Sequence, residues 1–109
     1  MDLITKIQDL IQELSSYIKG LQNWGIKRAN AEKEYNTVLA QEVLKERDKG
    51  TAIGVINLTC KGKVEVAEKR LERDIAEVMY QVSQEKINVA KLELRLLDSQ
   101  ASREWSVKD

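Results

Sequence analysis

Basic side chains gather in one short stretch of this chain, directly after an apolar segment. The residues from Lys61 to Arg73 include five lysines and arginines and three glutamates. Such a cluster could bind the phosphate groups of a nucleotide or of nucleic acid. The glutamates interleave with the basic residues, however, and 18 basic residues balance 18 acidic ones over the whole chain. The pattern therefore favours a charge-balanced, solvated helix face. Anion or nucleic-acid binding is the alternative, with four candidate residues: Lys61, Lys63, Arg70 and Arg73.

Groups that could catalyse a reaction are scarce. The chain has no histidine, which removes the commonest general base and the usual partner of a serine or cysteine nucleophile. Glycine-rich phosphate-binding motifs are also missing from the sequence. Paired carboxylates such as Glu65 and Glu68 stand among basic residues, where ion pairs along a helix are the common outcome. We therefore expect a protein without enzymatic activity, without a cofactor and without a metal.

The amino-acid composition is that of a helical protein, so helices must position these residues. The chain has 109 residues, no proline, no phenylalanine and 33% charged residues, and the alternation typical of strands is nearly absent. This predicts a single all-α domain over residues 1–109. The lone Cys60 fits a small buried side chain in a reducing cytoplasm. No targeting segment or membrane span is visible, so we expect no membrane partner.

The longest predicted helix spans about residues 63–107, which contain neither glycine nor proline. Its apolar residues form two stripes on different faces. A helix with two apolar stripes needs contacts on two sides. The first stripe consists of Val64, Leu71, Ile75, Val78, Val82, Val89, Leu92 and Leu96, and the second consists of Met79, Ser83, Ile87, Ala90, Leu94, Leu97, Ala101 and Trp105.

Two helices are predicted in the first half of the chain. The N-terminal one spans about residues 2–19 and is amphipathic, with apolar residues at steps of three and four. The stretch from Gly20 to Gly25 predicts a turn or a kink, because it holds two glycines and an asparagine. The next helix spans about residues 26–48 and carries a thinner apolar stripe. Most of its circumference is expected to be solvated.

A short apolar segment then connects to the long helix. We predict a helix over about residues 52–60, with Gly50 ending the helix before it and Thr51 as its N-cap. A buried β-strand is the competing interpretation, because isoleucine and valine dominate the segment. A lone strand would leave its backbone groups unpaired, so the helix is preferred.

These lengths predict an antiparallel helical hairpin with a long C-terminal helix, in a coiled-coil-like bundle. At about 1.5 Å per residue, the helix over residues 26–48 covers the long helix only up to about Lys86. Beyond that point, either the N-terminal helix continues in line and covers the remainder, or another subunit does. The two stripes favour a homo-oligomer. The predicted interface with a second copy or another partner consists of Ile87, Ala90, Leu94, Leu97, Ala101 and Trp105.

A resemblance adds a biological setting. The runs from Glu65 to Tyr80 and from Ile87 to Trp105 resemble small helical proteins encoded by tailed phages and prophages of Gram-positive bacteria. The resemblance covers about residues 30–105 and rests on helix-forming residues. It implies a small protein that acts on another macromolecule in the cytoplasm of an infected host cell.

Two function classes follow from these observations. The first is a phage-encoded, non-enzymatic interaction protein that binds and modulates a host or phage protein of replication or antiviral defence. Its candidate partner patch consists of Ile53, Val55 and Ile56. The second is a nucleotide-signal sponge or a nucleic-acid-binding module that uses the basic residues near the short helix. The sequence alone does not separate the two.

Overall fold

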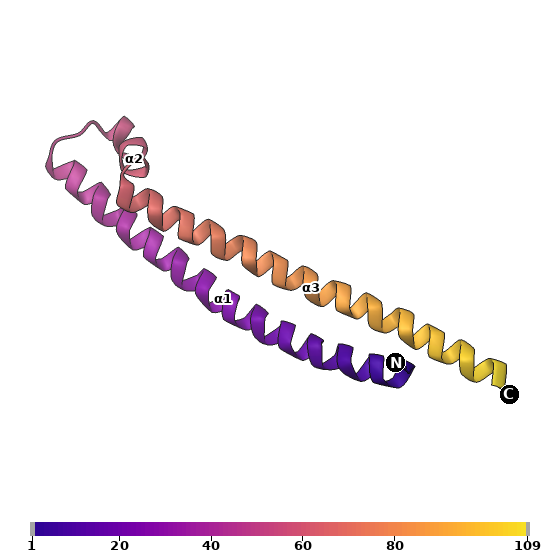
Figure 1. Ribbon diagram of the computed structural model, residues 1–109. Helices are drawn as coiled ribbons and strands as arrows, with labels where there is room; N and C mark the ends of the chain where they lie inside the picture. Colours follow the sequence, from indigo (N-terminus) through magenta and orange to yellow (C-terminus); the bar gives the residue numbers. More distant parts are fainter. Residues whose placement is uncertain (1, 109) are drawn as a thin grey trace. The chain divides into compact units, whose positions relative to one another are not determined.

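The protein is helical, as the sequence predicts. The computed structural model describes residues 2–108, with side chains up to residue 106. Within them lie α1 (Leu3–Asp48), α2 (Ile53–Lys61) and α3 (Val64–Lys108), and no strand (Figure 1). The predicted helices over about 52–60 and 63–107 are confirmed to within one residue. The strand interpretation of the short apolar segment is wrong.

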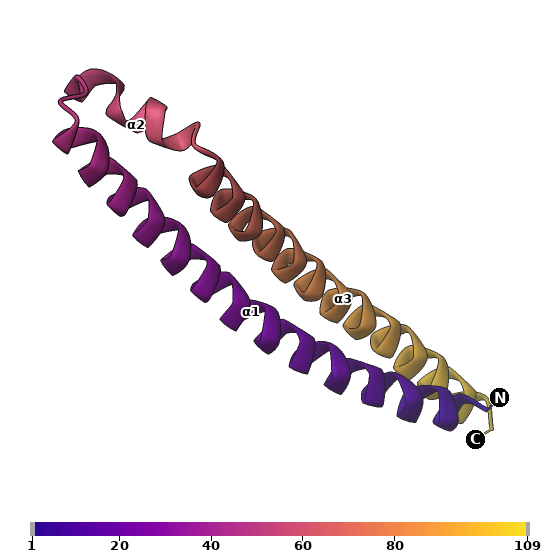
Figure 2. The same cartoon turned by 60° about the vertical axis from the view of Figure 1, so that its left-hand side comes forward.

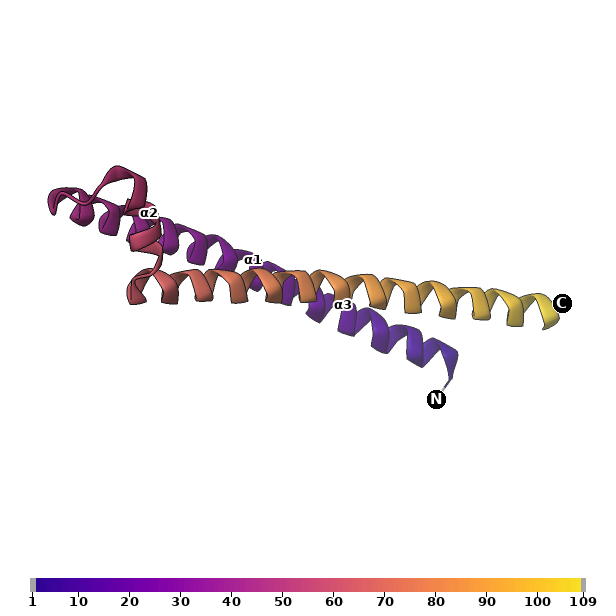
Figure 3. The same cartoon turned by 90° about the horizontal axis from the view of Figure 1, so that it is seen from above.

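The described residues form two compact units. The terminal unit combines residues 2–23 with residues 81–108, and the turn unit is Trp24–Tyr80. In each unit, a segment of α1 packs against a segment of α3 that runs in the opposite direction (Figure 2, Figure 3). The predicted antiparallel hairpin of two long helices is therefore confirmed.

The predicted break between residues 20 and 25 is wrong, because α1 continues through both glycines. A glycine inside a helix costs only about 1 kcal/mol relative to alanine, which packing on either side offsets. Half-buried Leu21 and Trp24 supply such packing. Gly25 also has a local role, since a Cβ atom there would lie 3.5 Å from Cε2 of Tyr80. The small residue lets that ring approach the helix.

An inner seam joins α1 and α3 in both units. Its members recur at steps of three and four residues, the spacing with which two helices pack side by side. In the terminal unit α1 therefore covers the far half of α3, which is the first of the two arrangements expected from the lengths. The buried or half-buried seam residues are Leu10, Leu14, Tyr17, Tyr35, Val38 and Glu42 on α1, and Val66, Arg73, Ala76, Tyr80, Ser83, Ile87, Ala90, Leu94, Leu97 and Ala101 on α3.

The connection between α1 and α2 turns sharply at Gly50. Its φ of +82° is the left-handed conformation that glycine adopts without strain. The amide of Gly50 donates to the carbonyl of Arg47, and that of Thr51 donates to the carbonyl of Glu46, which is the Schellman pattern of helix termination. Ala52, and not the predicted Thr51, occupies the N-cap of α2 and makes no side-chain cap. The Thr51 hydroxyl instead donates to the Glu46 carboxylate.

The hydrophobic core of the described residues is small. Eight hydrophobic residues are buried, and two of them are alanines. Seventeen large hydrophobic residues are exposed, which is more than twice the buried number. Such a distribution leaves apolar surface that intramolecular packing does not cover.

Two glycine substitutions test the continuous α1. Gly20→Ala should raise the free energy of unfolding by about 1 kcal/mol, because alanine favours the helix and its methyl group meets no atom within 4 Å. Gly50→Ala should lower it by about 1 kcal/mol, because alanine disfavours a positive φ. Urea denaturation followed by circular dichroism measures both. Destabilisation by Gly20→Ala would mean that α1 is interrupted there.

Candidate functional site

The strongest polar cluster lies in the turn unit, where α1 ends and α3 begins. We call it the Lys63 cluster, formed by Glu42, Glu46, Thr51 and Lys63. The Lys63 ammonium donates to Oε2 of Glu42 at 2.8 Å and lies 2.7 Å from Oε1 of Glu46. The Thr51 hydroxyl donates to Oε2 of Glu46 at 2.6 Å. Both carboxylates are buried, so the cluster fastens α1 to the start of α3.

The cluster changes the acidity of its members. The hydrogen bond from Lys63, followed by that from Thr51, lowers the pKa of Glu46 to about 2. The Lys63 hydrogen bond also lowers the pKa of Glu42, with a smaller contribution from Lys45. The same two carboxylates raise the pKa of Lys63 above its ordinary value. All three groups therefore stay charged at neutral pH.

The four predicted anion-binding residues do not form one free basic patch. Lys63 is held between two carboxylates, and Arg73 contacts Asp74 at 3.1 Å and lies over the ring of Tyr35. The Arg70 guanidinium donates to the backbone carbonyl of Lys61 at 3.4 Å. The Lys61 side chain is exposed. Such engaged cations have little capacity left for a phosphate group.

The predicted partner patch on α2 is partly displaced. Ile53 and Val55 are exposed, with 87% of the Ile53 surface accessible. Ile56 is buried together with Cys60, because these two residues lie on the same side of the helix, four residues apart. Leu58, which the sequence led us to expect in the core with Ile53 and Ile56, is 77% exposed. The apolar surface of α2 therefore consists of Ile53, Val55 and Leu58, which we call the α2 patch.

The predicted oligomer interface on α3 is largely used inside the chain. Ile87 and Ala90 keep only 8% and 2% of their surface, in the inner seam with α1 of the terminal unit. Leu94, Leu97 and Ala101 are half-buried in the same row. At Ile87 and Ala90 this face is therefore covered by α1 and is not free for a second copy. Among the predicted interface residues, only Trp105 is exposed, with 72% of its surface.

The other stripe of α3 is the one that stays open. We call it the outer stripe, and its members retain between 41% and 67% of their surface. It runs along α3 beside and behind the inner seam, because its members fall at heptad positions that the seam does not use. Its part in the turn unit is Val64, Leu71, Ile75 and Val78, and its part in the terminal unit is Val82, Val89, Leu92 and Leu96.

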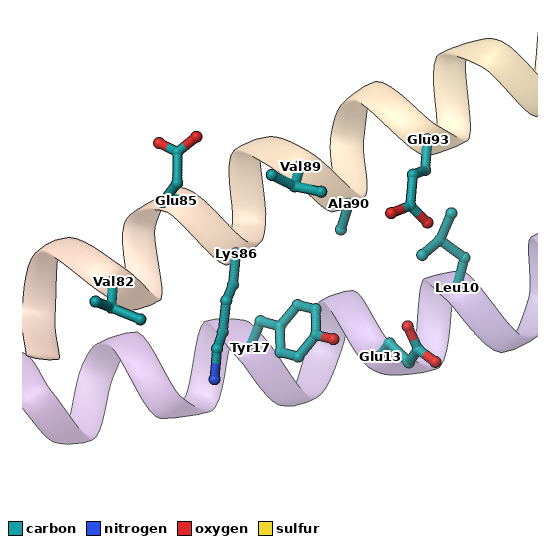
Figure 4. A pocket seen from close by; sticks show the side chains of 9 residues that line it. All are labelled: Leu10, Glu13, Tyr17, Val82, Glu85, Lys86, Val89, Ala90 and Glu93. Atoms are coloured by element: carbon teal, nitrogen blue, oxygen red, sulfur yellow. The ribbon is translucent and has the colours of Figure 1, made fainter.

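A hollow with a volume of about 310 Å³ lies between α1 and α3 of the terminal unit (Figure 4). Its apolar walls are Leu10 and Tyr17 from α1 and Val82, Val89 and Ala90 from α3. Figure 4 shows the carboxylates of Glu13 and Glu93 extending from opposite helices beside Leu10. The hollow has the size of a few side chains.

The described residues offer neither a metal site nor a membrane-spanning helix. No group of three or more histidine, cysteine, aspartate or glutamate side chains is placed to hold a metal ion in the part of the chain that the structure describes. Across those same residues, no helix combines the length and the hydropathy needed to cross a bilayer.

Comparisons with known proteins add no identity. No protein-family model matches the chain, no curated protein matches it, and no solved structure matches it. Function has to be argued from the surfaces described above.

Replacing Lys63 tests the cluster at the turn. Lys63→Met should lower the melting temperature by several degrees at pH 7, because it leaves two buried carboxylates without their cation. The pKa of Glu46 falls on folding, from an ordinary value of 4.5 to about 2. The contribution of the Glu46 carboxylate to stability is thus complete above pH 4.5 and is lost as the pH falls toward 2. The difference between wild type and variant should shrink over that interval in thermal melts.

Lys61→Met is the matched control, since it removes an exposed lysine two residues away. Its melting temperature should follow the wild-type curve at every pH. Equal effects of the two substitutions at pH 7 would contradict a stabilising role for the Lys63 cluster.

Proposed function

We propose that this chain is a non-enzymatic interaction protein that works as a homo-oligomer and binds another protein through apolar side chains on its surface. The observation that carries this proposal is the exposure of seventeen large hydrophobic residues among those described, against eight buried ones. Soluble monomers rarely leave apolar patches of this extent without a binding role. The arrangement of these residues in rows on helices, and not singly, supports the same conclusion.

The α2 patch is the surface proposed for the target protein. The burial of Ile56 and Cys60 anchors α2 in the turn unit. That anchoring presents Ile53 and Leu58 to solvent on a helix of only nine residues. The centre of a protein interface is depleted in charged residues and more apolar than its rim, which suits the aliphatic residues of the α2 patch.

An interaction role fits the chemistry better than catalysis. The chain lacks histidine, and its most strongly shifted acidic group, Glu46, is engaged by Lys63 and Thr51. A structural ion-pair network perturbs pKa values without forming an active site. The pairing of Lys63 and Arg73 with carboxylates likewise gives the alternative, a nucleotide sponge or nucleic-acid-binding module, less support.

The proposed setting comes from the sequence resemblance to small helical phage and prophage proteins. In that setting the chain is phage-encoded, acts in the cytoplasm of the host cell, and modulates a host or phage protein of replication or antiviral defence. A small protein without a catalytic group can do so by occupying the surface that the target needs for its own partner.

The test compares two double variants of α2. Ile53→Asp with Leu58→Asp places two charges in the α2 patch and should abolish capture of the target from a lysate of infected cells. The matched control, Asn57→Asp with Thr59→Asp, places the same two charges at exposed polar positions of the same helix. Mass spectrometry identifies proteins that bind wild type and control but not the patch variant.

The affinity of the purified target for each protein then measures the effect. The patch variant should bind at least about tenfold more weakly than the control, which corresponds to 1.4 kcal/mol. Equal binding by all three proteins, with helical circular dichroism retained, would contradict the proposal.

A further inference from the structure

We propose that a second copy of this chain docks on the outer stripe of α3, with the two α3 helices antiparallel and their outer stripes in contact. The proposal centres on the terminal unit, where Val82, Val89, Leu92 and Leu96 form the stripe. It deepens the oligomeric part of the proposed function, on which it rests, by naming the face and the occupant.

The spacing of the stripe identifies a helix as the occupant. Apolar residues occupy positions 82, 89, 92 and 96, and Glu85 occupies the remaining position of the same row, so the steps alternate between four and three. Alternating steps produce the two adjacent rows that a facing helix needs for knobs-into-holes packing. Three exposed isoleucines of α1 differ, because Ile4, Ile11 and Ile18 recur every seven residues and form a single row.

A second copy supplies a stripe of matching kind. Because the stripe is repeated on every molecule, contact between two copies buries apolar surface on both partners at once and closes with two-fold symmetry. An unrelated partner would have to supply its own helix with the same alternating steps. The self-complementarity of the row therefore favours a second copy over a foreign segment.

The exposed area of one chain is large enough for such a contact. The accessible surface is 8105 Å² for a mass of 12.5 kDa. Compact monomers of this mass expose about 6,200 Å², so the excess is about 1,900 Å². A stable interface removes about 800 Å² from each partner, or more in obligate dimers. Docking along the outer stripe can use surface that the chain already exposes in excess.

The hollow in the terminal unit gives a side chain of the second copy a place to insert. Val82 and Val89 belong both to the outer stripe and to the lining of the hollow, which also includes Leu10 of α1. A helix lying along the stripe therefore passes the mouth of a hollow that can take an aliphatic side chain. Such insertion would bury Leu10 further and join the second copy to both helices of the unit.

Glu85 determines the direction of the second helix. Figure 4 shows its carboxylate pointing away from α1, and in the sequence Glu85 stands between Val82 and Val89 of the outer stripe. In a parallel pair each residue of the stripe faces its own counterpart, which would bring two Glu85 carboxylates into one layer. Like charges in one apolar layer are strongly unfavourable. An antiparallel pair sets each Glu85 against another residue of the partner's stripe, which avoids this repulsion.

The main test is the mass of the full chain in sedimentation equilibrium at micromolar concentration. Wild type should give about twice the 12.5 kDa of one chain. Val89→Asp with Leu96→Asp should give the monomer mass with helical circular dichroism retained, because each position is about half exposed in one chain. A monomeric wild type, or a folded variant that stays dimeric, would overturn the inference.

Two controls keep the test decisive. Gln84→Asp with Lys91→Asp adds two aspartates with the same spacing on another exposed side of α3 and should leave the dimer intact. Glu85→Leu removes the charge from the stripe without creating a defect, and should lower the dimer dissociation constant by about tenfold. If the aspartate variant unfolds, Glu85→Leu decides, since an unchanged dissociation constant would overturn the inference.

Disulfide formation distinguishes a parallel from an antiparallel pair of α3 helices. Ser99→Cys places a thiol on the outer side of α3, far from the centre of an antiparallel pair, while native Cys60 is fully buried. Oxidation should leave this variant without a covalent dimer, and rapid disulfide formation would show a parallel pair. The α2 patch is unchanged in all these variants, so target binding fails or survives independently of dimer formation.

Discussion

The inner seam between α1 and α3 is the contact on which the rest of the structure depends. In proteins, most of the stability of a helix comes from packing its apolar face against another element, and within each unit α1 and α3 provide this packing for each other. The seam supplies that packing at steps of three and four residues, which commits one face of each helix to the other. The helix faces that the seam leaves uncovered, including the outer stripe, stay exposed in one chain.

The seam itself is poor in large side chains. Ala76, Ser83 and Ala90 are among its most buried members on α3, and they remove little apolar area from water. Polar contacts strengthen it in the turn unit, where Lys63 bridges Glu42 and Glu46, Lys69 reaches Glu34, and Arg28 pairs with Glu77. Other large aliphatic residues of α3, such as Leu71, Leu92 and Leu96, lie outside the seam. The chain thus keeps its most apolar helix face for contacts beyond itself, which links its modest core to the proposed binding role.

The sequence predicted the class of fold and most helix boundaries, because a chain without proline and with alternating apolar steps has few alternatives. It also predicted both stripes of α3. It did not predict which stripe faces inward. Hydrophobic periodicity shows how many apolar faces a helix has, but not which element packs against each of them. We expected the second stripe to face a second copy, whereas Ile87 and Ala90 face α1. The continuity of α1 was missed because glycine propensity was weighed without the packing on either side of Gly20 and Gly25.

The candidate sites depended on contacts that local patterns do not record. The sequence predicted Lys63 to be a free cation, because its partners Glu42 and Glu46 stand about 20 residues earlier. The signal was available, because Glu42 continues the seven-residue repeat of Tyr35 on the inner face of α1. On α2, the phase of a single short helix decided that Ile56 is buried and Leu58 exposed, and such a short segment gives no periodicity from which to read that phase.

The accessibility of an introduced thiol at position 92 tests the central claim most directly, namely that the outer stripe is open in one chain and covered by a second. The reaction of Leu92→Cys with a thiol reagent should be fast in dilute solution and slow down as protein concentration rises. Lys91→Cys, next to it on another face, should react at a rate independent of concentration, and buried Cys60 should stay unreactive in both. Equal rates at positions 91 and 92 at every concentration would contradict the account.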